Sequence, residues 1–211
     1  MTALLILGAG GHARVLAETA HLIGSFSRIA FIDDCYQDSP DSSTVLGWPV
    51  LGPLSYASRP EIAQEFSTAL VGIGNCSIRM HLLEQLINLG YESPPLIHPR
   101  AFISSSAHIG PGSVVFAQVA VQAQAHIGTG VILNTGCIVD HDVEIEDGVH
   151  ICPGVRLAGD VHVGARSLIG IGACVIQQVR IGTDVTVGAG AAVIQDLPDG
   201  VTAVGVPGRI R

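Results

Sequence analysis

The stretch VILNTGCIVDHDVEIEDGVHICPGVRLAGDVHVG, residues 131–164, repeats one pattern every six residues. Positions 133, 139, 145, 151, 157 and 163 are all aliphatic, and this period runs unbroken from Ile97 to Val193. Residues 97–198 number 102, which is 17 times six, so the run contains no insertion. A period of six fits neither an isolated helix nor an isolated strand, and it predicts a hexapeptide-repeat parallel β-helix.

The remaining positions of each hexad explain how the repeat would fold. The fifth residue is small or β-branched, as in Ala107, Val131 and Val149, so two inward positions flank one outward position, as in a strand. The other residues are turn formers such as GPG, GTG and EDG. Each hexad is therefore a short strand plus a corner. Three hexads form one 18-residue coil of a triangular prism, with parallel strands stacked about 4.8 Å apart.

The composition bounds the class of protein. Mean hydropathy is +0.49 and only 13% of residues are charged, yet Gly, Ser, Gln and His interrupt every apolar stretch before it could span a membrane. We therefore expect a cytoplasmic protein with no membrane span. The net charge of −8, with no lysine, argues against nucleic acid as a partner. The five cysteines form no CxxC pair, and we interpret them as buried apolar residues or incidental thiols.

The first 95 residues alternate between strand and helix patterns, which predicts a small parallel sheet. Strands are expected at 3–7, 28–32 and 67–72, and helices at 13–23 and 77–89. The spacing Gly8-x-Gly10-x-x-Ala13, with an acid about 20 residues on, matches a dinucleotide-binding fingerprint. Because this region is one mononucleotide-binding half, we favour a bound nucleotide group over redox use of NAD, which stays as an alternative.

One corner of the prism departs from the others. Val139-Asp140-His141-Asp142 places a histidine between two carboxylates, at a position that points outward. A neighbouring carboxylate orients an imidazole and favours its protonated form, which suits a general base near neutral pH. The alternative is a plain surface histidine.

Stacking by 18 predicts two columns of outward residues. One column contains His108, His126, Glu144, His162 and Arg180, and the other contains Val114, Ile132, His150, Leu168 and Thr186. Rungs in one subunit do not converge tetrahedrally on an ion, so polar packing is favoured over a metal ladder. The segment from Ala101 to Val139 has no Asp, Glu, Lys or Arg, which favours an oligomer contact over a surface kept soluble by uncharged polar groups.

The whole chain resembles the sugar acyltransferases that join a small nucleotide-binding domain to a left-handed β-helix. These are the nucleotide-activated amino-sugar N-acetyltransferases and the sialic-acid O-acetyltransferases. The resemblance rests on GAGGHARVLAE, FIDD, GIGNCSIR, IHPRAFIS, residues 131–164, IGIGACV and AVGVPGRI. It implies a homotrimer with active sites between subunits and acetyl-CoA as the co-substrate, without a metal.

The resemblance also implies roles for particular residues. His141 would be the general base, Asp142 would raise its basicity, and the Gly159 N–H is a candidate oxyanion donor. The residues expected near acetyl-CoA are Asn134, His150, Gly159, Ile171 and Ala189. The residues expected to hold the nucleotide-sugar are Gly10, Gly11, His12, Asp33, Asp34 and Gly74.

We thus divide the chain into a Rossmann-like nucleotide-sugar-binding domain (1–96), a left-handed parallel β-helix (97–198) and a C-terminal tail (199–211). The function predicted first is acetyl transfer from acetyl-CoA to the amine of a UDP- or GDP-linked 4-amino-deoxy sugar. Sialic-acid O-acetylation is the second. A metal-dependent β-helix protein and a purely structural β-helix are more distant alternatives.

Overall fold

The computed structural model describes residues 2–35 and 44–211. Two compact units divide the chain, residues 1–94 and 95–211. The boundary falls between Pro94 and Pro95, two residues before the position taken from the hexads, because Leu96 already pairs with Val114 of the next coil. Each unit is described by itself.

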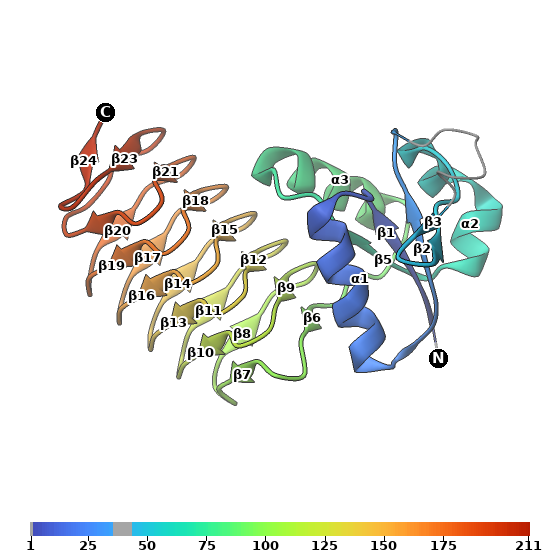
Figure 1. Cartoon of the computed structure of the whole chain (residues 1–211), viewed down its shortest axis with the longest axis horizontal. Coiled ribbons are helices and arrows are strands. Elements are labelled where there is room, and N and C mark those ends of the chain that lie inside the picture. The colour runs from blue at the N-terminus through green and yellow to red at the C-terminus, as the bar shows by residue number, and fades with distance from the viewer. Residues whose placement is uncertain (1, 36–43) are drawn as a thin grey trace. The chain divides into compact units, whose positions relative to one another are not determined.

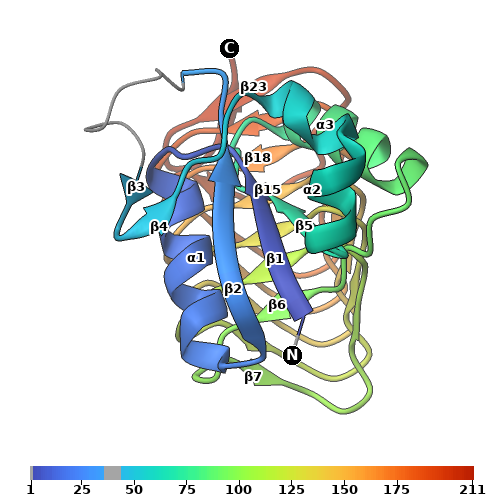
Figure 2. The same ribbon diagram turned by 90° about the vertical axis from the view of Figure 1, so that its right-hand side faces the viewer.

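The first unit is built on a three-stranded parallel sheet in the order β2-β1-β5 (Figure 2). The strands are β1 (Thr2–Leu7), β2 (Phe26–Ile32) and β5 (Thr68–Val71). The hairpin strands β3 (Thr44–Val45) and β4 (Trp48–Pro49) pair antiparallel. All three sheet strands lie within two residues of their predicted positions, because continuous apolar runs favour strands buried on both faces.

Helices cover both faces of this sheet. The helix α1 (Gly11–Ile23) lies on one face, and α2 (Pro60–Glu65) and α3 (Cys76–Asn88) lie on the other, together with the 3₁₀ helix η2 (Leu54–Ser58) (Figure 2). Gly72, just after β5, permits close packing of α1, because an added Cβ would lie 2.5 Å from the Ala13 Cβ. No helix in the described part of the chain is long and apolar enough to cross a membrane.

The second unit is a parallel β-helix of nearly six coils (Figure 1). Each coil contributes one two-residue strand to each of three faces. The first face holds β6 (Leu96–Ile97), β9 (Val114–Val115), β12 (Ile132–Leu133), β15 (His150–Ile151), β18 (Leu168–Ile169) and β21 (Thr186–Val187). The second holds β7 (Phe102–Ile103), β10 (Ala120–Val121), β13 (Ile138–Val139), β16 (Arg156–Leu157), β19 (Cys174–Val175) and β22 (Ala192–Val193). The third holds β8 (His108–Ile109), β11 (His126–Ile127), β14 (Glu144–Ile145), β17 (His162–Val163) and β20 (Arg180–Ile181).

The predicted 18-residue register is confirmed by the strand pairs. His126 pairs with His108 and Glu144, and Ile132 pairs with Val114 and His150. The inward residues form one continuous core, in which Leu133 and Val139 are fully buried. Ile97, Ile103 and Ile109 are only partly buried, because the first coil has a neighbouring coil on one side only.

Two cysteines follow the predicted inward and outward pattern. Cys137 lies in the core, where burial raises the pKa of its thiol to about 12, whereas Cys174 is exposed. A thiol with such a raised pKa is a poor nucleophile at neutral pH.

The segment 199–211, separated above as a tail, continues the prism. Its strand β23 (Thr202–Val204) pairs in parallel with β21, and β24 (Arg209–Ile210) returns antiparallel to β23. The hexad period ends before this segment, so the period alone could not place these two strands.

Candidate active site

The three corners of the prism differ in their side chains. The Asn134 corner joins the first face to the second and contains residues 134–136 with the residues stacked on them at intervals of 18. The His141 corner joins the second face to the third and contains residues 140–142 with their stacked counterparts. The third corner contains residues 146–148. The Asn134 and His141 corners thus lie at the two ends of β13.

The His141 corner holds a fixed imidazole–carboxylate pair. The Nδ1 of His141 lies 2.8 Å from Oδ2 of Asp142, and Asp140 Oδ1 accepts a hydrogen bond of 2.8 Å from the His141 backbone N–H. Asp142 has φ 58°, the left-handed region, which non-glycine residues other than Asn and Asp adopt rarely. When Nδ1 donates to Asp142, Nε2 of the neutral imidazole keeps its lone pair and can accept a proton.

The electrostatics of this corner strengthen the base. The hydrogen bond between His141 Nδ1 and the Asp142 carboxylate is the largest cause that raises the pKa of His141. Desolvation opposes it, and the nearby charges of Asp140, Asp142 and Asp160 raise the pKa further. The side chains of His141 and Asp142 are 60% and 56% exposed, so a substrate can reach them. The arrangement can accept a proton from a nucleophile and return it to a leaving group.

Gly159 lies directly against the imidazole, one coil after His141. A Cβ added at Gly159 would lie 2.5 Å from Cε1 and 2.6 Å from Nε2 of His141. A side chain at this position would therefore displace the imidazole of His141. Gly159 is also the predicted oxyanion donor, and its backbone lies beside the imidazole of His141.

The predicted acetyl-CoA residues other than Gly159 gather at the Asn134 corner. Asn134 Nδ2 lies 3.3 Å from His150 Nε2, and the Asn134 Oδ1 accepts from the Thr135 N–H at 2.9 Å. Ile171 and Ala189 stack at the same corner, because they stand 18 residues apart. The N–H of Gly190 donates to the Ile171 carbonyl at 2.8 Å. Both side chains are exposed.

The chain thus divides its predicted site residues between two corners. His141, Asp142 and Gly159 lie together, whereas Asn134 and His150 lie together at the other end of β13. Asn134 was expected near acetyl-CoA, and in one chain it belongs to a different corner from His141.

The third face carries the polar column predicted from the 18-residue stacking. The rings of His108 and His126 stack at 4.7 Å. The two ring nitrogens of His162 lie 3.2 Å from Glu144 Oε2 and 3.1 Å from Glu146 Oε1. In residues 2–35 and 44–211, no three His, Cys, Asp or Glu side chains are grouped as metal ligands. The side chains of this column are joined by ring stacking and by contacts between His162 and two carboxylates.

The predicted nucleotide-sugar residues all follow strand ends of the first unit. Gly10, Gly11 and His12 follow β1, Asp33 and Asp34 follow β2, and Gly74 follows β5. The carboxyl edge of a parallel sheet, where α1 also begins, is where ligands bind in this class of fold. An added Cβ at Gly10 or Gly11 would meet no atom within 4 Å, so the loop is open.

The two acids of this edge bind the protein's own backbone. Asp33 Oδ2 accepts a 2.6 Å hydrogen bond from the Ala9 N–H, and Asp34 Oδ1 accepts a 2.9 Å bond from the Leu54 N–H. They tie the glycine loop and η2 to the end of β2. Both carboxylates therefore have a structural role in addition to any contact with a ligand.

Sequence reasoning missed Arg79, in the first turns of α3. Its side chain is 1% exposed, and Nη1 donates to the carbonyls of Ile73 (3.2 Å) and Gly74 (2.9 Å). Burial lowers the pKa of Arg79. The guanidinium fixes the loop after β5 in place. The motif GIGNCSIR contains this arginine, but nothing in the pattern indicated that it is buried.

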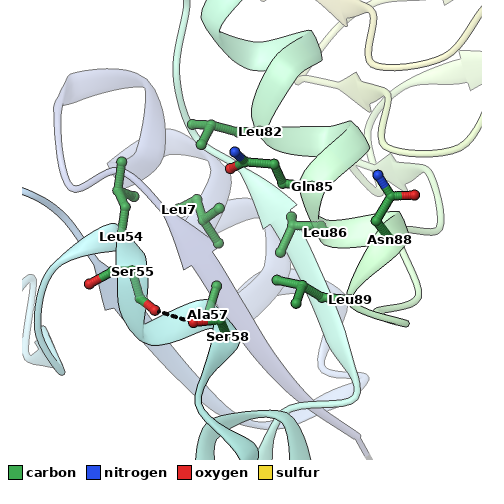
Figure 3. A pocket seen from close by; sticks show the side chains of 10 residues that line it. All are labelled: Leu7, Leu54, Ser55, Ala57, Ser58, Leu82, Gln85, Leu86, Asn88 and Leu89. Atoms are coloured by element: carbon green, nitrogen blue, oxygen red, sulfur yellow. Dashed lines mark hydrogen bonds between the residues drawn. The ribbon is translucent and has the colours of Figure 1, made fainter.

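A cavity of about 400 Å³ lies beside this edge, between η2 and α3 (Figure 3). Leucines from β1, η2 and α3 line it together with four uncharged polar side chains, which are Ser55, Ser58, Gln85 and Asn88. It adjoins the glycine loop through Leu7, which precedes Gly8, and contains none of the six predicted nucleotide-sugar residues.

Comparison with known proteins places these features in a family. The model of the PglD N-terminal domain matches residues 3–86. The acetyltransferase domain of PglB from Neisseria gonorrhoeae is 42% identical with a TM-score of 0.95, and each chain covers 100% of the other. A structure of that domain in complex with acetyl coenzyme A has a TM-score of 0.94 at the same identity, covering 100% of this chain and 99% of that one.

Two further proteins resemble this chain in sequence, and one of them also in structure. A histidine-to-alanine variant of GDP-perosamine N-acetyltransferase from Caulobacter crescentus, in complex with CoA and GDP-perosamine, is 38% identical with a TM-score of 0.92, covering 100% of this chain and 97% of that one. The UDP-N-acetylbacillosamine N-acetyltransferase of Bacillus subtilis is 39% identical over 124 residues. That match spans 56% of this chain and 52% of the curated relative, about half its length.

The β-helix and its histidine corner define a hexapeptide-repeat acyltransferase. The resemblance noted in the sequence is confirmed at full length. The chain belongs to the family of sugar N-acetyltransferases that combine a PglD-type N-terminal domain with a β-helix.

Proposed function

We propose that the protein transfers the acetyl group of acetyl-CoA to the amine of a nucleotide-linked 4-amino-deoxy sugar, with UDP or GDP as the nucleotide. The observation that carries this proposal is the His141–Asp142 pair, exposed at a corner and lying against Gly159. Relatives named as bacillosamine and perosamine N-acetyltransferases support the substrate class.

In the proposed reaction, His141 acts as a general base through Nε2. The neutral imidazole takes a proton from the acceptor amine as the nitrogen attacks the thioester carbonyl carbon. The N–H of Gly159 stabilises the negative charge that develops on the carbonyl oxygen. Transfer is direct, without an acyl-enzyme, because the described partners of the His141 side chain are Asp142 and Gly159, and neither offers a hydroxyl or thiol nucleophile.

The first unit would hold the nucleotide. The open glycine loop at Gly10 and Gly11 leads into α1, where backbone N–H groups and the helix dipole favour a phosphate. His12 lies in the first turn of α1, and Arg79 holds Gly74 at the neighbouring strand end. Because both substrates are intracellular metabolites, we place the reaction in the cytoplasm.

A homotrimer would complete the site. The second face, which lies between the two functional corners, carries Phe102 and Ile138 at 57% and 39% exposure, with Cys174 also exposed. Such an apolar surface favours contact with another copy. A three-fold arrangement around the second face brings the Asn134 corner of one protomer toward the His141 corner of the next.

The test is a thiol-release assay with acetyl-CoA and a panel of UDP- and GDP-linked 4-amino sugars, with free sialic acids in a parallel series. We expect release of CoA with at least one amino sugar and an amide in the product by mass spectrometry. Acetylation of sialic-acid hydroxyls alone would contradict the proposal.

A further inference from the structure

The His141 corner carries net negative charge, concentrated in the two coils around His141. Counting the second, third and fourth positions of its hexads, residues 104–196 contribute four carboxylates and no Lys or Arg. The four are Asp140, Asp142, Asp160 and Asp196. The corresponding positions of the Asn134 corner contain no carboxylate. The third corner also has four carboxylates, Glu146, Asp147, Asp184 and Asp199, but it contains Arg166, which pairs with Asp184. The His141 corner differs from both in having carboxylates without a cation.

Three of these carboxylates surround a single imidazole. Asp142 bonds to Nδ1, and Asp140 accepts from the backbone N–H of His141. Asp160 follows Gly159, which touches the ring, and its own N–H donates to the His141 carbonyl at 3.0 Å. Asp160 is exposed, and its charge acts on His141 in the same direction as the other two.

Orientation of the base requires only one of the three. Asp142 alone fixes Nδ1, so Asp140 and Asp160 add negative potential where the acceptor must arrive. A sugar amine is largely an ammonium ion near neutral pH, whereas a sialic acid carries its own carboxylate. A local negative field at the corner attracts the ammonium group, which is the part of the nucleotide-sugar that reaches His141, and repels a carboxylate close to a reacting hydroxyl.

We propose that Asp140 and Asp160 are specificity residues that recruit the acceptor as an ammonium ion and disfavour anionic hydroxyl acceptors. This inference rests on the proposed function. The bound ammonium first loses one proton to solvent, and the neutral amine then forms the C–N bond while Nε2 of His141 takes a second proton. As the oxyanion collapses, the C–S bond breaks and the leaving thiolate takes the proton held by His141.

The test compares Asp140→Asn, Asp160→Asn and the double variant with Asp184→Asn. Asp184 is a matched control because it occupies the same hexad position as Asp160, with φ 56° against 59°, but lies at the third corner, paired with Arg166. Asn tolerates the left-handed conformation and keeps an oxygen acceptor.

We expect KM for the amino sugar to rise roughly 3- to 10-fold in each Asp140 or Asp160 variant, with kcat within about 2-fold of the parent. The rise should shrink at high salt. Inhibition by the matching 4-hydroxy nucleotide sugar, which is uncharged at C4, should not change, and Asp184→Asn should behave as the parent.

An unchanged KM, or equal weakening of the 4-amino and 4-hydroxy ligands, would overturn the inference while leaving amine acetylation intact. A parent protein that acetylates no amine would overturn the proposed function and this inference together.

Discussion

The Asn134 and His141 corners have the same backbone and different side chains. At the fourth hexad position both turn through the left-handed region. Four coils of the Asn134 corner place glycine there, at 136, 154, 172 and 190, whereas four coils of the His141 corner place Gln124, Asp142, Asp160 and Gln178. A side chain in this conformation costs roughly 1–2 kcal/mol, less for Asp. The His141 corner therefore keeps side chains at positions where the left-handed backbone conformation favours glycine. This is the corner where we place the reaction.

The largest expected effect comes from removing the base. His141→Ala should lower kcat/KM about 10²–10⁴-fold, because proton removal is then left to water. The exposed His108, on the third face, supplies the control, and His108→Ala should retain the parental rate. Thiol-release kinetics measure both. Near-parental activity in His141→Ala would show that the general base does not lie at this corner.

The next effect tests the close approach at Gly159. Gly159→Ala should lower kcat about 10–100-fold, because the new methyl group displaces the imidazole from its position. The clash involves an exposed side chain, so the melting temperature should change little.

Gly164→Ala provides the contrast for that variant. Its added Cβ would lie 2.5 Å from the backbone of Gly182, so stability should fall. Thermal melts beside kinetics separate the two cases, and a Gly159→Ala protein that turns over at the parental rate would contradict the geometry.

A smaller effect is expected at the other corner. The double variant Asn134→Ala, His150→Ala should raise KM for acetyl-CoA about 10–30-fold, since each lost hydrogen bond is worth about 1 kcal/mol. KM for the acceptor should stay within about 2-fold, because the acceptor belongs to the His141 corner. A rise in the acceptor KM alone would show that the Asn134 corner binds the acceptor and not acetyl-CoA.

The smallest effect concerns pH. Asp142 raises the pKa of His141, so a neutral base predominates only above that raised value, and the rate should climb as pH rises through it. Asp142→Asn removes the charge, lowers the pKa of His141 and should shift the midpoint of kcat/KM toward lower pH. A midpoint that stays in place would show that Asp142 does not set the basicity.

The sequence predicted most of the fold because the pattern that determines the β-helix is local and repeats every six residues. The aliphatic sixth positions determine which residues face inward, and the 18-residue coil then places His150 beside Ile132 and Gly159 one coil after His141. The same arithmetic could have indicated Asp160, which stands 18 residues after Asp142. Strands β23 and β24 lay outside the period and were missed.

The site of the first unit was harder to predict from the sequence, because it depends on contacts between residues that do not recur at a regular spacing. The burial of Arg79 and its bonds to Ile73 and Gly74 depend on how α3 packs, which no spacing encodes. Asp33 and Asp34 matched a ligand-binding pattern, yet their carboxylates bond to Ala9 and Leu54. A carboxylate after a strand can bind a ligand, accept a hydrogen bond from a loop of the protein, or do both, and the sequence does not distinguish these roles.

The claim that the two corners meet between copies is tested most directly by mixing chains. His141→Ala and the double variant Asn134→Ala, His150→Ala are co-expressed with different tags, and mixed oligomers are purified through both tags. Every trimer that carries both tags contains both variants, so one of its three intersubunit sites, about one third, combines an intact His141 corner with an intact Asn134 corner. We predict recovery to roughly that fraction of parental activity. Activity no greater than that of the two variants measured separately would contradict the account.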